Sequence, residues 1–160
     1  TFAGRARPVI RRVRTGRLLQ LGFPDPAGAR GGVYTQHSGD RAGMGRGEVF
    51  FIAVGASDGR TDVLGFSSHG VDGDEHHTGV YVRGAATRDG VGSALLRTAE
   101  ASAIAAGARS LQLDSSLAAV EFYKANGFDE VGRGEHRLWS GRSMACVFMR
   151  KALGPSGGDG

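Results

Sequence analysis

The spacing of hydrophobic residues becomes regular about a third of the way along the chain, where it predicts strands. Residues 48–54 form a β-branched and aromatic run that is typical of a buried strand. Residues 62–69 and 77–82 are two further strand-like runs, and the second of them starts as early as His76. The segment 56–60 contains Asp-Gly, a strong hairpin signal. We therefore expect these strands to be joined by short turns.

Helix and strand signals alternate over the rest of the chain. One alanine-rich segment has a helical apolar face made of Leu95, Leu96, Ala99, Ala103 and Ala106. Gly107 and Gly127 are placed to end the two predicted helices, and Ser116 is placed to cap the second one. The predicted elements are a helix at 93–106, a strand at 109–114, a helix at 117–126, and strands at 128–134 and 143–153.

The order of these elements indicates one α/β domain. From residue 48 it is β-β-β-α-β-α-β-β, which predicts a single mixed sheet flanked by helices. A chain of 160 residues is long enough for one domain and its core. We expect the domain to span 1–153, with 48–153 as its core and 154–160 as a flexible tail.

The N-terminal part, residues 1–47, is poorly determined by its pattern. Residues 8–13 predict a strand, but 15–46 are rich in Gly and Arg and have no regular apolar spacing. Residues 1–48 hold nine Arg against three acidic residues, so their net charge is +6, whereas the whole chain has +4. The positive charge is therefore a property of this segment and not of the whole chain.

Composition excludes several classes of protein. Glycine is abundant, at 28 residues, but it has no collagen-like period. The sequence has no apolar run as long as a membrane helix and no apolar core of a signal peptide. The one cysteine, Cys146, excludes a disulfide framework and lies in an apolar strand, so we expect a buried residue rather than a nucleophile. We expect a cytoplasmic protein with no metal and no membrane contact.

The glycine-bearing loop between the strand ending at Val82 and the first helix predicts an anion site. Glycine lets the main chain approach a ligand closely, and the free N–H groups of a helix N-terminus attract phosphate. A tight turn with no ligand is the alternative interpretation. A dinucleotide fingerprint needs Gly or Ala where Leu95 stands, and a P-loop needs a lysine that this loop lacks. The amides that would hold a pyrophosphate are those of Gly90, Val91, Gly92 and Ser93, with Arg88 as a charged contact.

Two motifs give the chain a resemblance to a known family. The segments VYVRGAATRDGVGSALL (80–96) and FYKANGF (122–128) lie at the right separation and in the right element order. Together they resemble the core of a GNAT-type acetyl-CoA-dependent N-acetyltransferase over about residues 48–151. The resemblance implies the GNAT-like acyl-CoA N-acyltransferase fold, a mostly antiparallel mixed sheet with one splayed parallel strand pair.

The resemblance also implies where coenzyme A binds. In the family, pantetheine adds to the first splayed strand like a further strand, and a bulge usually causes the splay. Gly79 suits such a bulge or simply avoids a clash. Thr87 departs from the usual Gln or Arg of the loop, which implies weaker phosphate binding. The implied coenzyme A contacts are Val80, Tyr81, Val82, Arg88, Asp89, Gly90, Val91, Gly92, Ser93, Ser116 and Tyr123.

Tyr123 has the family position of the general acid that protonates the departing thiolate. Ser116 stands seven residues earlier, which is two turns of a helix, so both side chains are expected on one face. A core tyrosine whose hydroxyl reaches solvent is the alternative.

The general base is expected near the start of the strand that leads to Val82. His76 falls at that position and shares a face with Val80, and Glu75, Asp74 and His77 are close alternatives. A solvated acidic turn is the competing interpretation. Asp74 and its acidic neighbours would attract a cationic amine. His136 lies in a segment that resembles the acceptor-side hairpin of one branch of the family, and a surface histidine is its alternative.

The predicted function is transfer of the acetyl group of acetyl-CoA to a primary amine of a small molecule or protein, directly in a ternary complex. A non-catalytic coenzyme-A-binding module and a nucleic-acid-binding protein with a basic arm are the alternatives, and the lack of interleaved aromatic residues argues against the latter. Residues 15–46 are interpreted as a divergent acceptor lid, a basic arm or a frame-shifted segment. The resemblance leaves a homodimer open.

Overall fold

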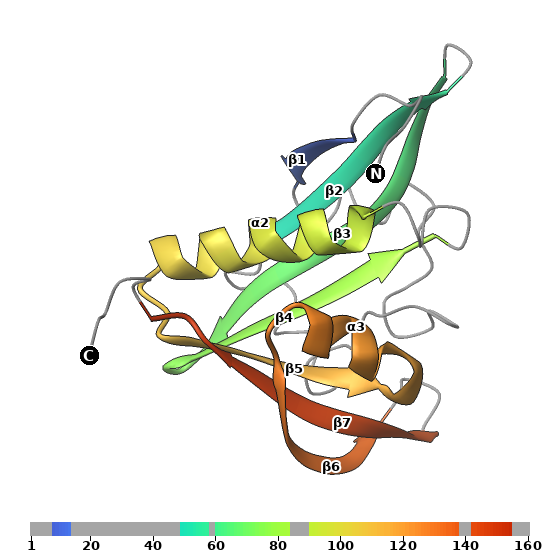
Figure 1. Cartoon of the computed structure of the whole chain (residues 1–160). Helices are drawn as coiled ribbons and strands as arrows, with labels where there is room; N and C mark the ends of the chain where they lie inside the picture. The colour runs from blue at the N-terminus through green and yellow to red at the C-terminus, as the bar shows by residue number, and fades with distance from the viewer. Residues whose placement is uncertain (1–7, 14–48, 58–59, 84–89, 138–141, 155–160) are drawn as a thin grey trace.

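One seven-stranded mixed sheet organises the described part of the chain (Figure 1). The computed structural model describes residues 8–13, 49–57, 60–83, 90–137 and 142–154. Neighbouring strands are antiparallel except β4 and β5, which are parallel. The predicted mixed, mostly antiparallel sheet with one parallel pair is therefore confirmed. In spatial order the strands are β1 (Val9–Val13), β2 (Val49–Ser57), β3 (Arg60–Asp72), β4 (Glu75–Val82), β5 (Ser110–Ser116), β7 (Ser143–Ala152) and β6 (Asp129–Arg137).

The helices of the described chain cover one face of this sheet (Figure 1). Helix α2 spans Val91–Ala105, and a 3₁₀ turn, η4 (Leu117–Ala119), leads directly into α3 (Val120–Ala125). Helix α2 packs against β2, β3 and β4. In contrast, η4 and α3 pack against β5, β6 and β7. Each helix therefore belongs to one side of the β4–β5 boundary.

Alternation along the strands divides the apolar residues between the two faces of the sheet. On the face under the helices, the main core joins strand residues to α2 and α3. Its large members include Val80, Leu95, Leu96, Leu111, Leu113, Tyr123, Val147 and Met149. A second cluster of Phe50, Ile52 and Phe66 lies on the opposite face, because these residues have the other parity from Ala53 of the main core.

Both predicted helix stops are confirmed. Gly107 and Gly127 have φ of 88° and 93°, which favour glycine because a side chain is strained there. The chain then turns back on the helix: the N–H of Ala108 donates to the carbonyl of Ala103 at 2.9 Å. The N–H of Phe128 likewise donates to the carbonyl of Tyr123 at 3.0 Å.

Several details of the predicted helices are wrong. Helix α2 begins at Val91, so Gly92 belongs to its first turn rather than to the loop, and Ala106 is an exposed C-cap residue outside the apolar face. The segment predicted as one helix at 117–126 is divided into η4 and the six-residue α3. Ser116 is the last residue of β5 and precedes η4 with extended dihedrals, and its side chain makes no capping hydrogen bond. It therefore does not share a helix with Tyr123.

The parallel strands β4 and β5 separate soon after they meet. In the described ranges their register contains one pair, His77 with Gln112. The expected splay of β4 and β5 is therefore present. The predicted bulge at Gly79 is wrong, because the β3–β4 register runs through Gly79 without a shift.

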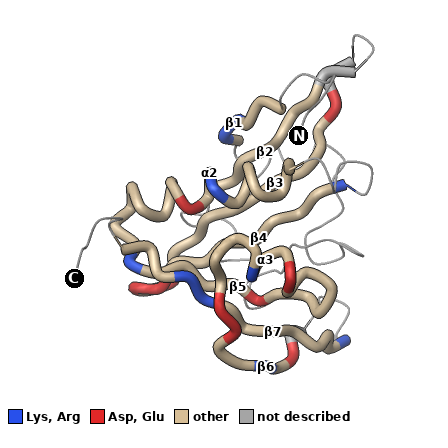
Figure 2. The backbone as a smooth tube through the Cα atoms, viewed as in Figure 1, with Lys and Arg blue, Asp and Glu red and all other residues tan. Residues whose placement is uncertain are grey.

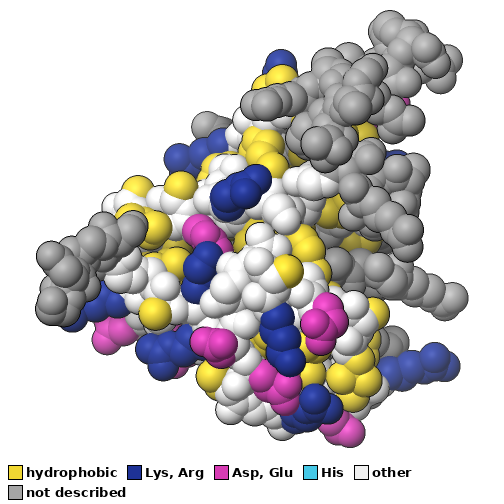
Figure 3. Space-filling view, in the orientation of Figure 1, with side chains coloured by type: hydrophobic (Ala, Val, Ile, Leu, Met, Phe, Trp, Pro, Cys, Tyr) yellow, Lys and Arg dark blue, Asp and Glu magenta, His cyan; other side chains and the backbone are white. Residues whose placement is uncertain are grey.

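Charges of both signs are interspersed over the described elements. Figure 2 shows Lys and Arg close to Asp and Glu along β6, β7 and α3, and Figure 3 shows the same mixture on the face that carries the helices. An electrostatic site for nucleic acid needs a basic patch or stripe, and the described side chains on this face form none. Within the described ranges, no helix has the length and apolar character needed to span a membrane.

Candidate functional site

The main-chain groups of Val80 and Val82 point into the gap between β4 and β5. The N–H of Arg83 donates to the carbonyl of Leu64 on β3 at 2.8 Å. In an antiparallel ladder, alternate residues bond to the same neighbouring strand. Tyr81 therefore bonds toward β3 as Arg83 does, whereas Val80 and Val82 present their N–H and C=O groups to the β5 side. Among the described residues no strand pairs with this stretch of β4, which is therefore an open edge in the middle of the sheet.

Tyr123 of α3 reaches this open edge. Its side chain is fully buried, and its ring meets the rings of Phe122 and Phe128 edge-on at centroid distances of 5.1 and 5.7 Å. Burial raises the pKa of Tyr123 well above that of an ordinary tyrosine, and a backbone hydrogen bond at Val80 opposes the rise. A hydrogen bond lowers the pKa of a phenol when it donates to the phenolate oxygen, so the Val80 group is its amide N–H. The Tyr123 hydroxyl thus lies at the Val80 amide.

The N-terminus of α2 lies beside the same gap. Its N-cap, Gly90, has φ of 75° and offers no side-chain cap, and the first turn holds no acidic residue. The first-turn amides are therefore available to an anion. A Cβ on Gly92 would lie 3.1 Å from the Phe122 ring and 3.3 Å from the Val82 side chain, so the glycine lets α2, α3 and β4 meet closely.

The structure brings together part of the predicted coenzyme A site. Val80, Val82, Val91, Gly92 and Tyr123 come from three elements and meet around the open end of the gap. Ser93 follows in the same first turn of α2 and is half-buried. Ser116 lies at the C-terminal end of β5, across the gap from β4. The side chain of Tyr81 is on the opposite face, stacked on Phe66 at 5.6 Å. Arg88, Asp89 and Thr87 lie outside the described residues.

His76 lies on the closed side of the gap, in a hydrogen-bonded series under α2. Its Nδ1 is 2.8 Å from Nε2 of His69, and Nδ1 of His69 is 2.9 Å from the Ser102 hydroxyl. The two imidazoles stack with centroids 5.1 Å apart. Burial and the neighbouring His76 lower the pKa of His69. His76 shares a face with Val80, as predicted, but four residues of strand separate their Cα atoms by ~13 Å.

His69 is a site residue that the sequence pattern did not bring forward. It is 3% exposed, and it stands diagonally opposite His76 across the β3–β4 hairpin. The signal that could have found it is the short turn: Asp72 pairs with Glu75, so odd positions of β3, including His69, have the same facing as even positions of β4, including His76.

Asp74 and Glu75 are far from Tyr123. Both are exposed and lie at the β3–β4 turn, which Figure 2 shows as acidic at the end of β4 opposite to Arg83. Glu75 contacts His77, with 3.6 Å between Oε2 and Nε2. The structure therefore groups these carboxylates with each other and not with the open edge of β4.

The β6–β7 hairpin extends past the end of β5. Ser116, the last residue of β5, pairs with Cys146 of β7. Two residues further toward the tip of the hairpin, His136 of β6 pairs with Met144 of β7. The backbone of His136 is thus on the open side of the gap, while its side chain is outside the described set. Cys146 is buried as predicted, and burial together with Asp114 and Glu135 raises the pKa of its thiol. A protonated, buried thiol is a poor nucleophile.

A metal centre has no support in the described residues. They contain no group of three or more His, Cys, Asp or Glu side chains that could hold an ion.

Comparison with protein families gives one match that covers this site. A model described as an acetyltransferase (GNAT) domain matches residues 46–130, slightly more than half of the chain. The match includes β2 to β5, helices α2 and α3 and the open strand edge. A comparison with curated proteins gave no match.

Several solved structures share the fold over nearly the whole chain. A GCN5-related N-acetyltransferase from Rhodopseudomonas palustris is 22% identical, with a TM-score of 0.69 over 93% of this chain and 98% of that one. A phosphinothricin acetyltransferase from Sinorhizobium meliloti in complex with AcCoA is 18% identical, with 0.67 over 93% and 90%. A putative acetyltransferase from Salmonella typhimurium with its cofactor acetyl-CoA is 18% identical, with 0.66 over 94% and 96%. At these identities the likeness is one of fold.

Proposed function

The chain belongs to the GNAT acetyltransferase family and is an acetyl-CoA-dependent acyltransferase, and from this premise we propose that its acceptor is a primary amine of a small molecule or protein. Transfer is direct, within a ternary complex. The observation that carries this proposal is the Tyr123 hydroxyl at the Val80 amide, inside the gap between β4 and β5.

The residues around the gap fit acetyl-CoA in two ways. The carbonyl of Val80 and the main-chain groups of Val82 can pair with the amides of pantetheine as with an added strand. The first-turn amides of α2, from Val91 to Ser93, can bind the pyrophosphate, because the helix dipole favours an anion there and the first turn holds no acidic side chain. Acetyl-CoA supplies the activated acetyl group as a thioester.

The Tyr123 hydroxyl at the gap supports the chemical step. The neutral amine attacks the carbonyl carbon of the thioester, and negative charge develops on the carbonyl oxygen. The C–N bond forms, the C–S bond breaks, and Tyr123 donates its proton to the departing thiolate. Its raised pKa keeps this hydroxyl protonated at neutral pH, so it is ready to donate.

The acceptor's own proton must leave through a base. We retain His76 for this role, and its distance along β4 from Val80 means that it acts through water molecules. Glu75 lies one residue further away and would need a longer path. Asp74 and His136 stay predicted acceptor contacts, on opposite sides of the gap.

Other predictions about the whole protein also stay predictions. They include an acceptor lid in the N-terminal third, which lies mainly outside the described residues, a homodimer, and a cytoplasmic location.

A panel of amines tests the acceptor class. Purified protein is incubated with acetyl-CoA and, in turn, phosphinothricin, spermidine, a peptide with a free N-terminus and a lysine peptide. Coenzyme A thiol release and the acetyl mass added to each amine are measured. We expect amine-dependent release with at least one of them. If acetyl-CoA binds but no amine raises its turnover, a non-catalytic coenzyme-A-binding module is supported instead.

The role of Tyr123 is tested with Tyr123→Phe, which keeps the ring and removes the hydroxyl. We expect kcat to fall by about 10²-fold or more because the thiolate loses its proton donor, while the Kd for coenzyme A changes by less than about twofold. Thr98→Val is the matched control, since it deletes a hydroxyl that bonds to the Ala94 carbonyl within α2. Equal kcat in wild type and Tyr123→Phe would exclude the acid role.

A further inference from the structure

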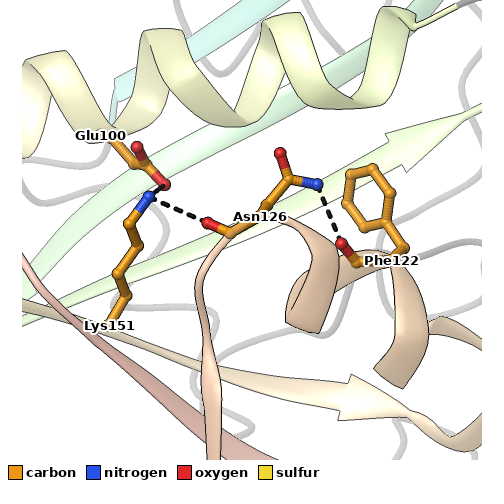
Figure 4. A network of polar contacts seen from close by, with 4 residues as sticks. All are labelled: Glu100, Phe122, Asn126 and Lys151. Atoms are coloured by element: carbon orange, nitrogen blue, oxygen red, sulfur yellow. Dashed lines mark hydrogen bonds and ion pairs between the residues drawn. The ribbon is translucent and has the colours of Figure 1, made fainter.

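Lys151 of β7 connects the two helices that border the site. Its Nζ donates to Oε1 of Glu100 on α2 and to the main-chain carbonyl of Asn126 after α3, both at 2.9 Å. Figure 4 shows the ammonium group between these two partners, with its stem rising from the sheet. The side chains of Lys151 and Glu100 are 28% and 12% exposed, so both contacts are partly shielded from water.

The carbonyl that Lys151 binds belongs to the C-cap of the helix that carries Tyr123. The Asn126 side chain donates back to the carbonyl of Phe122 at 2.9 Å, as Figure 4 shows. The N–H groups of Asn126 and Phe128 both donate to the carbonyl of Tyr123 at 3.0 Å. Lys151 is therefore attached to the same hydrogen-bonded turn as the tyrosine.

Packing gives Lys151 a second route to Tyr123. Its Nζ lies 5.9 Å from the ring centroid of Phe128, and that ring meets Tyr123 edge-on. A Cβ on Gly127 would be 3.1 Å from Cε of Lys151, so the turn after α3 lies directly on the lysine stem.

Tertiary contacts must set the position of α3, because it has only six residues. A helix this short is not stable by itself in water. The helix packs on the β5 side of the gap, whereas the target of Tyr123, the Val80 amide, belongs to the β4 side. The contact from Lys151 to Glu100 crosses the same boundary, since β7 lies on the β5 side of the gap and α2 packs on the β4 side.

We propose that Lys151 is a positioning residue for Tyr123: its bonds to Glu100 and Asn126 hold α3 at the height where the tyrosine hydroxyl meets the Val80 amide. The inference rests on the proposed function, in which that hydroxyl is the proton donor. Lys151 touches neither substrate, so its loss should affect the chemical step and leave binding of acetyl-CoA nearly intact.

The test compares Lys151→Met, Lys151→Arg and Arg150→Gln. Met keeps the length and apolar stem but loses both bonds, and Arg restores a cation that can reach both acceptors. Arg150 is the matched control, because it is the next residue of β7, exposed, and donates to the Ser110 hydroxyl at 3.1 Å. Each protein is made with 3-fluorotyrosine, and the ¹⁹F signal of Tyr123 among the three tyrosines is assigned with Tyr123→Phe. kcat, KM for acetyl-CoA and the Kd of coenzyme A are measured with the amine that wild type acetylates.

For Lys151→Met we expect a shifted Tyr123 signal and a fall in kcat of about 10-fold, with KM and Kd within about twofold of wild type. Lys151→Arg should recover most of the kcat, and Arg150→Gln should match wild type. If Lys151→Met does not fold, Glu100→Gln is used with the same readouts. An unmoved Tyr123 signal with wild-type kcat, or equal losses in the Lys151 and Arg150 variants, would overturn the inference. Wild type that acetylates no amine contradicts the proposed function, and the Tyr123 signal then still decides whether Lys151 positions the ring.

Discussion

Two side chains near this site, those of Tyr123 and His69, are both packed in the protein interior and engaged in polar contacts. Tyr123 is fully buried in the main core and also presents its hydroxyl to the open edge of β4. His69 fixes β3 to α2 through Ser102 and to β4 through His76. A residue with both packing and polar contacts has little freedom to move, which favours the fixed geometry that proton transfer requires.

The buried His69 should make stability depend on pH. Its pKa is lowered in the folded protein, so below pH ~6.5 the unfolded chain binds a proton that the folded protein resists. The free energy of unfolding is then highest above that pH and falls as the pH drops toward the lowered value, by up to ~1.4 kcal/mol per pH unit.

Urea unfolding between pH 8 and 5 measures this dependence in wild type and in His69→Gln, which keeps a polar side chain that does not titrate. We expect a flatter curve for the variant. His76→Gln serves as the comparison, since it removes the imidazole beside His69 but leaves the burial of His69. The same slope in wild type and His69→Gln would show that other groups control the response.

At the level of elements, the close meeting of α2, α3 and β4 depends on Gly92. An added methyl group would press on the Phe122 ring and the Val82 side chain, so that α3, the edge of β4 or these two side chains must shift slightly.

Gly92→Ala should therefore weaken coenzyme A binding by about 10-fold, while the helix propensity of alanine, worth ~1 kcal/mol, offsets much of the strain in the free protein. Calorimetric titration with coenzyme A and thermal unfolding separate the two effects. Gly132→Ala is the control, because its Cβ would have an ordinary contact of 3.5 Å with Phe148. Unchanged affinity in Gly92→Ala would mean that the ligand does not use this contact region.

Much of the fold could be predicted from the sequence because local signals agree with it. Gly107 and Gly127 end helices, since few other residues tolerate their positive φ. The division at Ser116 could not be predicted, because the continuation of β5 depends on its pairing with Cys146 on β7, a strand 30 residues later. The role of Lys151 was missed for a similar reason: its partners come from two helices distant in sequence.

The main-chain parts of the candidate site could be predicted from the sequence, whereas the positions of its catalytic side chains could be predicted less well. The motif around Gly90 and Gly92 indicates a helix N-terminus beside a strand end, and the structure has both. Alternation along β4 predicts the correct face for His76. It does not predict that β4 and β5 pair at His77, which leaves His76 on the closed side of the gap.

For the whole molecule, acetyl-CoA should stabilise the folded state according to its concentration. A ligand that binds only the folded protein adds ~2.7 kcal/mol at 100 times its Kd, so the melting temperature should rise steadily with the logarithm of acetyl-CoA concentration. Adenosine monophosphate, which lacks pantetheine, should give a much smaller rise. A melting temperature that does not change with acetyl-CoA concentration would contradict binding in the gap.

The single register pair between β4 and β5 makes the sheet two hydrogen-bonded ladders that share one hinge. One ladder contains β1 to β4 and carries α2, and the other contains β5, β7 and β6 and carries α3. Bending either ladder would break a row of main-chain bonds, whereas a small rotation between them disturbs one register pair, His77 with Gln112, and the side-chain contacts that cross the boundary, such as Lys151 to Glu100. Changes in the width of the gap should therefore be concentrated at this hinge, and each half of the sheet should move nearly as a rigid body.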